Sequence, residues 1–288
     1  MTHSSTPTEI EIPIPGMTLK ALAWGPPSGR PLLAVHGWLD NAASFIPLAP
    51  LLGDYRIVAV DLPGHGQSPW RDAGATYHFV DWVPVIFEVA DALGWERFTY
   101  VGHSMGAAIG SLAAGTFPER IASLTMIEGL GPLVYEDHEV PERLGAFILQ
   151  RRRLIRKEPH PHPSREAAAK RLSRVVSMLS VESARMLVDR GTKEVAGGFT
   201  WRTDPRLRRI SPIRFTEGQV EAFVARIAAP SLVILAEDGW PLPVEIMESR
   251  LAKFSRVEVA RLAGGHHIHM ELASTVADVI ADFLNGLA

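Results

Sequence analysis

The residues with the clearest chemical potential lie in the segment Gly102-His103-Ser104-Met105-Gly106. An apolar run typical of a strand precedes this segment, and a run of small residues typical of a helix follows it. A Gly-x-Ser-x-Gly pattern between a strand and a helix indicates a sharp turn with an exposed serine, because the two glycines let neighbouring backbone approach closely. We therefore predict that Ser104 is a nucleophile that attacks a carbonyl carbon. A turn that only packed the helix onto a sheet would not require serine at its apex.

Attack on a carbonyl places negative charge on its oxygen, and fixed backbone amides can stabilise that charge. A predicted strand over 31–35 ends in His36-Gly37-Trp38, where a loop amide can face the nucleophile. We predict that the backbone amides of Trp38 and Met105, the residue after Ser104, form this oxyanion hole. His36 itself is interpreted as a residue that orients the loop.

A serine nucleophile also needs a general base, and a histidine after the last strand is expected to serve. His266, His267 and His269 all follow the apolar run at 257–260, so the residues alone leave three candidates. Clustered histidines can also bind metal, but no spacing of carboxylates and histidines elsewhere in the sequence completes a ligand set. We predict no metal site and no organic cofactor.

The third member of such a site is a carboxylate that orients the imidazole. Glu128 follows the apolar run at 121–127, and Asp238 follows the run at 231–235. The carboxyl ends of parallel strands line the crevice in which open sheets bind ligands, so both positions are suitable. Both also keep the chain order serine, acid, histidine.

Compact apolar runs separated by helical stretches predict the scaffold that positions these residues. Runs without polar alternation fit strands of a mostly parallel sheet that is buried on both faces and flanked by helices, an α/β fold. An antiparallel hairpin with its turn at Gly16 is predicted at one edge, and an amphipathic helix over 274–287 closes the chain. The predicted parallel strands are 32–35, 57–60, 98–101, 121–127, 231–235 and 257–260.

The stretch 133–214 differs in composition, because it is rich in arginine and in helix-forming residues. We predict an all-helical cap over the carboxyl edge of the sheet. The core domain is then made of two segments, 1–132 and 215–288, which share one sheet.

Composition and charge restrict the partners. The net charge of -3 gives no electrostatic case for nucleic acid or an acidic membrane surface, and the absence of cysteine excludes disulfides and thiolate chemistry. The first residues do not resemble a signal peptide, and no long apolar segment is present. We expect a cytoplasmic protein with a small-molecule substrate and without nucleic-acid or membrane partners; its oligomeric state is left open.

Four motifs occur in an order that resembles the α/β-hydrolase superfamily: HGW at 36–38, DLPGHGQS at 61–68, GHSMG at 102–106 and GGHHIHME at 264–271. Within it, the sequence is similar to the serine hydrolase-like proteins. The resemblance implies the α/β-hydrolase fold. It also implies that His266, which directly follows the glycine turn, is the catalytic histidine, whereas His269 and Glu271 begin the final helix.

The resemblance also bears on the acid. In the common superfamily pattern, Gly-x-x-Asp ends the later strand, and here that pattern puts Gly239 where the aspartate belongs. Asp238 lies one residue early and needs a rearranged loop. Haloalkane dehalogenases, similar in fold, take their acid from the earlier strand end, and the 24 positions between Ser104 and Glu128 are like their spacing. We therefore favour Glu128 and keep Asp238 as the alternative.

These residues together predict a serine hydrolase, carboxylesterase-like, that cleaves an ester or related acyl bond of a small, largely apolar substrate through an acyl-serine intermediate. Serine at 104, rather than aspartate, argues against the alkyl-transfer chemistry of dehalogenases. A carbon-carbon bond hydrolase or a lactonase would use the same residues. A ligand-binding homologue without turnover is the alternative from another class.

Overall fold

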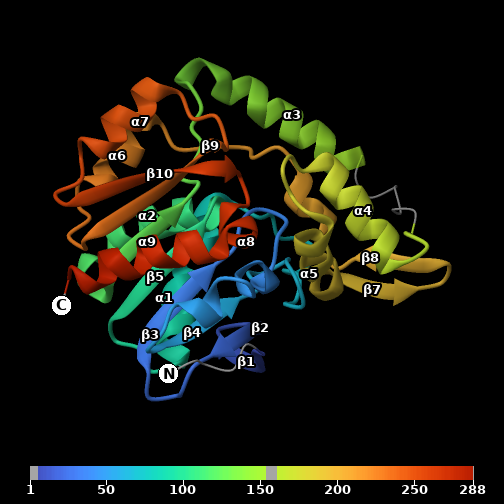
Figure 1. Ribbon diagram of the computed structural model, residues 1–288. Coiled ribbons are helices and arrows are strands. Elements are labelled where there is room, and N and C mark those ends of the chain that lie inside the picture. Colours follow the sequence, from blue (N-terminus) through green and yellow to red (C-terminus); the bar gives the residue numbers. More distant parts are fainter. Residues whose placement is uncertain (1–5, 154–160, 288) are drawn as a thin grey trace.

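An eight-stranded sheet organises the computed structural model, which describes residues 6–153 and 161–287 (Figure 1). The strand order is β1-β2-β4-β3-β5-β6-β9-β10. The edge hairpin β1-β2 and the pair β2-β4 are antiparallel, and the other neighbouring pairs are parallel. The strands are β1 (Thr8–Ile14), β2 (Met17–Trp24), β3 (Arg30–Val35), β4 (Tyr55–Val60), β5 (Phe98–His103), β6 (Ile121–Ile127), β9 (Ser231–Asp238) and β10 (Val257–Gly265).

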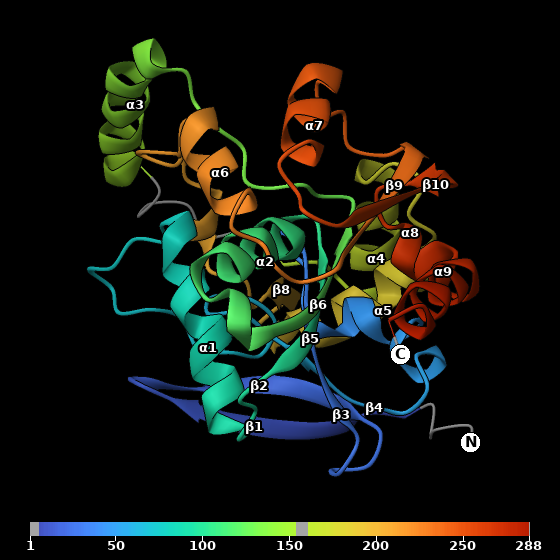
Figure 2. The same ribbon diagram turned by 90° about the vertical axis from the view of Figure 1, so that its left-hand side faces the viewer.

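Helices cover both faces of the sheet, with α1 and α2 on one side and α9 on the other (Figure 2). Side chains alternate between these faces: Leu33 and Val35 pack in the core under α1 and α2, whereas Leu32 and Ala34 pack in the core under α9. Burial on both faces explains why the strands read as unbroken apolar runs. The helices are α1 (Trp82–Ala92), α2 (Met105–Thr116), α6 (Glu217–Val224), α7 (Val244–Leu251), α8 (Ile268–Glu271) and α9 (Ala273–Asn285).

Each predicted strand is present, and the prediction of a mostly parallel sheet flanked by helices is confirmed. Several strands are longer than the apolar runs from which they were predicted. β9 extends to Asp238 and β10 to Gly265, because their backbones remain paired after the side chains have become polar or small. This extension matters because both strand ends lead into the site.

The stretch between β6 and α6 contains α3 (Val140–Arg153), α4 (Arg165–Val175), α5 (Val181–Gly191) and a two-stranded hairpin, β7 (Thr192–Val195) and β8 (Gly198–Trp201). The expectation of an all-helical segment is therefore wrong. Gly197 and Gly198 have φ of 85° and 137°, values that favour glycine and allow the tight turn between the two strands. The part of the helical prediction that falls on 154–160 lies outside the described residues.

This inserted stretch packs on loops that follow the carboxyl ends of the strands. The buried guanidinium of Arg190 in α5 pairs with the buried carboxylate of Asp61, at 2.9 Å between Nε and Oδ2. The amide of Asn41 donates to the carbonyl oxygen of Leu187 at 2.9 Å. A buried pair would be costly if it lost one partner, so these contacts hold the stretch over that edge of the sheet. Within the described ranges, every helix is too short or too polar to span a bilayer.

Candidate active site

Ser104 lies at the junction of β5 and α2 in a strained backbone conformation, with φ of 51° and ψ of -113°. Close approach of neighbouring backbone makes this turn possible. A Cβ atom on Gly106 would lie 2.0 Å from the carbonyl oxygen of Val35, and one on Gly102 would lie 2.4 Å from the carbonyl carbon of Gly106. The amide of Ser104 donates to the carbonyl oxygen of Ile127 at 2.8 Å. The predicted strand, turn and helix thus hold the serine at the carboxyl edge of the sheet.

His266, the first residue after β10, links this serine to a carboxylate. Its Nε2 lies 2.9 Å from Oγ of Ser104, and its Nδ1 lies 3.0 Å from Oε2 of Glu128. A carboxylate only accepts hydrogen bonds, so Nδ1 carries the proton and Nε2 is left to accept from the serine hydroxyl. This tautomer is the one that a general base toward Ser104 requires.

The carboxylate of Glu128 is buried and accepts three hydrogen bonds. Besides His266, the backbone amides of Ala236 and Trp240 donate to it at 2.6 and 2.8 Å. Burial acts to raise the pKa of Glu128, but these bonds to the charged form outweigh it and hold the pKa below its ordinary value. Glu128 therefore stays ionised while it orients the imidazole.

Gly239 provides the space for that carboxylate. A Cβ atom at this position would lie 2.1 Å from Oε2 of Glu128. Asp238 is exposed at the end of β9, and the bonds of the His266 ring among the described residues go to Ser104 and Glu128. The structure thus brings Glu128 to His266 and does not bring Asp238 there, because the loop at 236–240 wraps around the Glu128 carboxylate.

Trp38 and Met105, the predicted sources of oxyanion amides, occupy equivalent places beyond two paired strands. Val35 of β3 pairs with Gly102 of β5. Trp38 lies three positions after Val35, and Met105 lies three positions after Gly102. Met105 is the first residue of α2, where amides have no partner within the helix. No hydrogen bond within the described part of the chain engages either amide. Both are therefore available to a ligand oxygen.

Exposed apolar side chains lie near the polar residues of the site. The ring of Trp240 lies 5.8 Å from that of His266, and Trp38 is about half exposed next to the elbow. Met178, in the turn between α4 and α5, is also exposed, and a Cβ atom on Gly265 would lie 2.7 Å from its Cβ. Trp240 and Met178 therefore lie beside the segment that carries His266.

The neighbouring histidines occupy other environments. His36 accepts from the amide of Leu62 at 3.1 Å and donates to the carbonyl oxygen of Gly37 at 2.7 Å, which fits a residue that orients the loop. His267 faces Asp40 instead of Ser104, at 3.2 Å. His269, in α8, is fully buried, and its ring packs against that of Phe45. Of the three histidines considered from the sequence, only His266 contacts the serine among the described residues.

Sequence reasoning did not identify the amides of Ala236 and Trp240 as donors to the acid, because backbone donors carry no side-chain signal. It also overlooked Asp40, whose carboxylate lies near His103 and His267, residues 63 and 227 positions away in the chain. Among the described residues, these three alone form a group of histidine and carboxylate side chains whose ligand atoms all lie within 4.8 Å of one another.

The fold described above agrees with the comparison to known protein families. A family model described as the alpha/beta hydrolase fold matches residues 30–273, which is most of the chain. The chain belongs to the α/β-hydrolase family. The predicted fold and the predicted resemblance are thereby confirmed.

Relatives of similar length strengthen the assignment to this family. A serine hydrolase-like protein of Danio rerio is 32% identical, over 96% of this chain and 88% of the relative. Serine hydrolase-like protein 2 of Homo sapiens is 33% identical, over 96% and 94%. The crystal structure of a hypothetical protein from Pseudomonas aeruginosa PAO1 is 41% identical, with a TM-score of 0.91 over 96% of this chain and 99% of that one. The chain is a hydrolase of the α/β-hydrolase superfamily.

Proposed function

We propose that the protein is a serine hydrolase that cleaves a carboxylic ester or a related acyl bond, with Ser104 as nucleophile, His266 as general base and acid, and Glu128 as the orienting carboxylate. The observation that carries this proposal is the continuous line of hydrogen bonds from Glu128 through His266 to Ser104, at 3.0 and 2.9 Å. The line ends on a serine held at the strained apex of a turn. Family membership alone would not distinguish a catalyst from a binding protein.

In the first half of the reaction, Oγ of Ser104 attacks the carbonyl carbon while Nε2 of His266 takes the hydroxyl proton. The carbonyl electron pair moves to oxygen, and the amides of Trp38 and Met105 stabilise the resulting oxyanion. Collapse of this intermediate breaks the bond to the alcohol, which receives the proton from His266. Glu128 stabilises the positively charged imidazolium throughout.

In the second half, water attacks the acyl-serine. His266 takes a proton from this water, and the new oxyanion is held by the same two amides. Its collapse returns the proton to Oγ of Ser104 and releases the carboxylic acid. All of these steps use groups of the chain, and we predict that neither a metal nor an organic cofactor takes part.

The inserted stretch supports a largely apolar substrate. Met178 from this stretch lies beside Gly265, which precedes His266, and the ring of Trp240 lies 5.8 Å from the His266 ring. Trp38 follows β3, the strand that pairs with β5 before Ser104. We propose that residues 133–214 form a cap on a core made of 1–132 and 215–288, and that the cap covers the acyl or alcohol group of the substrate. A small-molecule substrate and a cytoplasmic location remain predictions.

Covalent labelling tests the nucleophile. We expect purified protein to react with a fluorophosphonate probe at Ser104, as identified by mass spectrometry of the peptide, because such probes trap serines activated by a base. Ser104→Ala should not be labelled, whereas Ser111→Ala, a change of a buried serine in α2, should leave labelling intact. A folded protein that is not labelled and turns over no ester would support the binding homologue instead.

A chain-length series tests the substrate class. p-Nitrophenyl esters from acetate to decanoate should show kcat/KM that rises with acyl length until the apolar site is filled, because each buried methylene contributes about 0.8 kcal/mol. Met178→Ser should flatten this rise with little change for acetate. A profile that decreases steadily from acetate would contradict an apolar acyl site.

A further inference from the structure

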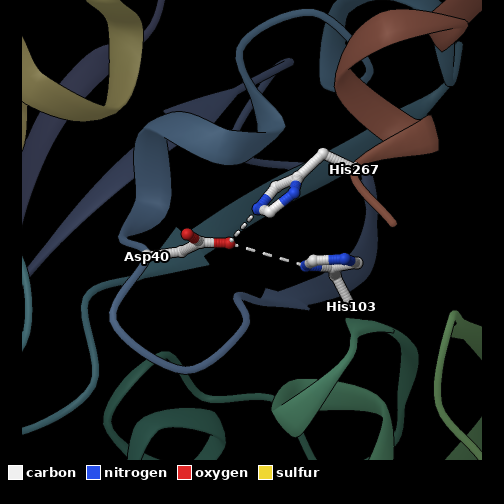
Figure 3. A group of neighbouring side chains, drawn as sticks. All are labelled: Asp40, His103 and His267. Carbon is white, nitrogen blue, oxygen red and sulfur yellow. Dashed lines mark hydrogen bonds and ion pairs between the residues drawn. The ribbon is translucent and has the colours of Figure 1, made fainter. Parts of the chain in front are cut away.

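A second polar cluster, drawn in Figure 3, lies next to His266: the rings of His103 and His267 are 4.8 and 5.5 Å from the His266 ring. It consists of Asp40, His103 and His267, all buried, which come from the loop after β3, the end of β5 and the start of the last helical region. Oδ2 of Asp40 lies 3.6 Å from Nδ1 of His103 and 3.2 Å from Nε2 of His267. All three atoms lie within 4.8 Å of one another.

The hydrogen bonds of His103 determine which of its nitrogens carries the proton. Its Nε2 lies 2.8 Å from the carbonyl oxygen of His266, and a carbonyl oxygen only accepts, so Nε2 is the donor. A second proton would charge a ring that is 1% exposed and packed against other imidazoles, which burial disfavours. Nδ1 of His103 therefore presents a lone pair.

That lone pair points toward a carboxylate, and among the described residues Nδ1 of His103 has no hydrogen-bond partner (Figure 3). The same oxygen, Oδ2 of Asp40, can accept a proton from Nε2 of His267, so an ordinary ion pair explains the contact between Asp40 and His267. This ion pair does not explain the contact with His103. There, the lone pair on Nδ1 of His103 faces the lone pairs of the Asp40 carboxylate in a buried place, and this repulsion costs free energy. A cation between them would turn this repulsion into attraction.

In place of the expectation from the sequence that the protein has no metal site, we propose that Asp40, His103 and His267 bind one divalent transition metal ion of the zinc class. Two imidazole nitrogens and one carboxylate oxygen are a donor set that zinc accepts, with a fourth position left for solvent. To become a ligand, Nε2 of His267 gives up the proton that it shares with Asp40, and this proton is released to solvent when the metal binds. Bonds of about 2.0–2.2 Å in tetrahedral geometry place ligand atoms about 3.3–3.5 Å apart, close to the two distances from Asp40. The donation from Nε2 of His103 to a backbone carbonyl is the outer contact typical of histidines that ligate metal.

Such an ion would join three loops that carry the proposed catalytic groups. Asp40 follows Trp38 by two positions, His103 precedes Ser104, and His267 follows His266. Binding to the folded state alone would therefore raise the thermal stability of the protein. Because the readout is binding, the inference holds or fails independently of the proposed hydrolase activity.

Calorimetric titration with zinc chloride tests the proposal. Tag-free protein is first treated with a chelator and dialysed, and we expect one zinc ion per chain and a higher melting temperature. Asp40→Asn and His267→Gln should each weaken binding by at least the 10–100-fold typical of lost outer contacts, since they remove direct ligands. His138→Gln, a change of an exposed histidine, is the matched control and should bind as the wild type does.

Cobalt chloride provides a second measurement that does not depend on stability. Bound cobalt should show the visible absorption of a four- or five-coordinate ion, and this band should be lost in Asp40→Asn. The proposal is wrong if the wild type binds no zinc, or if both cluster variants bind it as tightly as the wild type. It is also wrong if His266→Gln, but neither cluster variant, weakens binding, because the ion would then sit on the catalytic histidine.

Discussion

Glu128 and Asp238 are two carboxylates at the ends of neighbouring strands, β6 and β9, yet they lie in opposite environments. Glu128 is buried and accepts hydrogen bonds from two amides and an imidazole. Asp238 is exposed, and its strand has already turned toward solvent. The comparison teaches that the donors around a carboxylate at a strand end, and not its place in a sequence pattern, decide whether it is held against the histidine.

The register of the two strands explains the difference. Ile127 pairs with Ile234, and the amide of Glu128 donates to the carbonyl oxygen of Ile234 at 2.8 Å. Glu128 thus leaves the sheet beside the middle of β9, whereas β9 continues four residues further to Asp238. The segment from Ala236 to Trp240 lies around the Glu128 carboxylate, and the backbone amides of these two residues donate to it.

Removing the charge of each carboxylate in turn is the strongest test of this comparison, and the largest effect is expected at Glu128. Glu128→Gln should lower kcat of ester hydrolysis by about 10²–10⁴-fold, because the imidazole loses its orienting charge and its tautomer. Asp238→Asn should change it by no more than about twofold, the range of an exposed substitution. Steady-state kinetics on folded variants measures both. Loss of activity in Asp238→Asn alone would assign the acid to the other strand.

A smaller loss is expected when the space for Glu128 is filled. Gly239→Ala places a methyl group where the Oε2 atom lies, so the carboxylate must shift and kcat should fall by roughly 10²-fold, the cost of a misplacement near 1 Å. Gly218→Ala is the matched control, because a Cβ atom there meets nothing within 4 Å. If Gly239→Ala had wild-type kcat, the close packing around Glu128 would be irrelevant to activity.

The smallest effect concerns stability against pH. The pKa of Glu128 is below its ordinary value of 4.5, so its ionised form contributes stability that is fully present above that value and is lost as the pH falls through the lowered pKa. The difference in free energy of unfolding between wild type and Glu128→Gln should therefore shrink as the pH is lowered from 7 to 3. Urea titrations at several pH values measure it, and a constant difference would contradict the ionised, hydrogen-bonded state.

Local features of the fold could be predicted, whereas contacts between distant segments could not. The elbow at Ser104 was predictable because strand, glycines and helix follow one another within a few residues. The hairpin at Thr192–Trp201 was missed because the residues before it have strong helical propensity and its turn signal, Gly197-Gly198, is short. His103 and Asp40 gave no spacing signal, since their proximity depends on how two loops pack.

The sequence by itself determined where a strained serine turn forms and which runs become buried strands, because both depend on backbone preferences and hydrophobicity of adjacent residues. It offered Glu128 and Asp238 as acids and three histidines as bases without the means to choose from the residues alone. The tertiary structure decided which of them meet, since strand register sets Glu128 against His266 and Gly239 leaves it space. It also brought Asp40 to His103 and His267, a grouping created by the packing of the end of β5 against two loops.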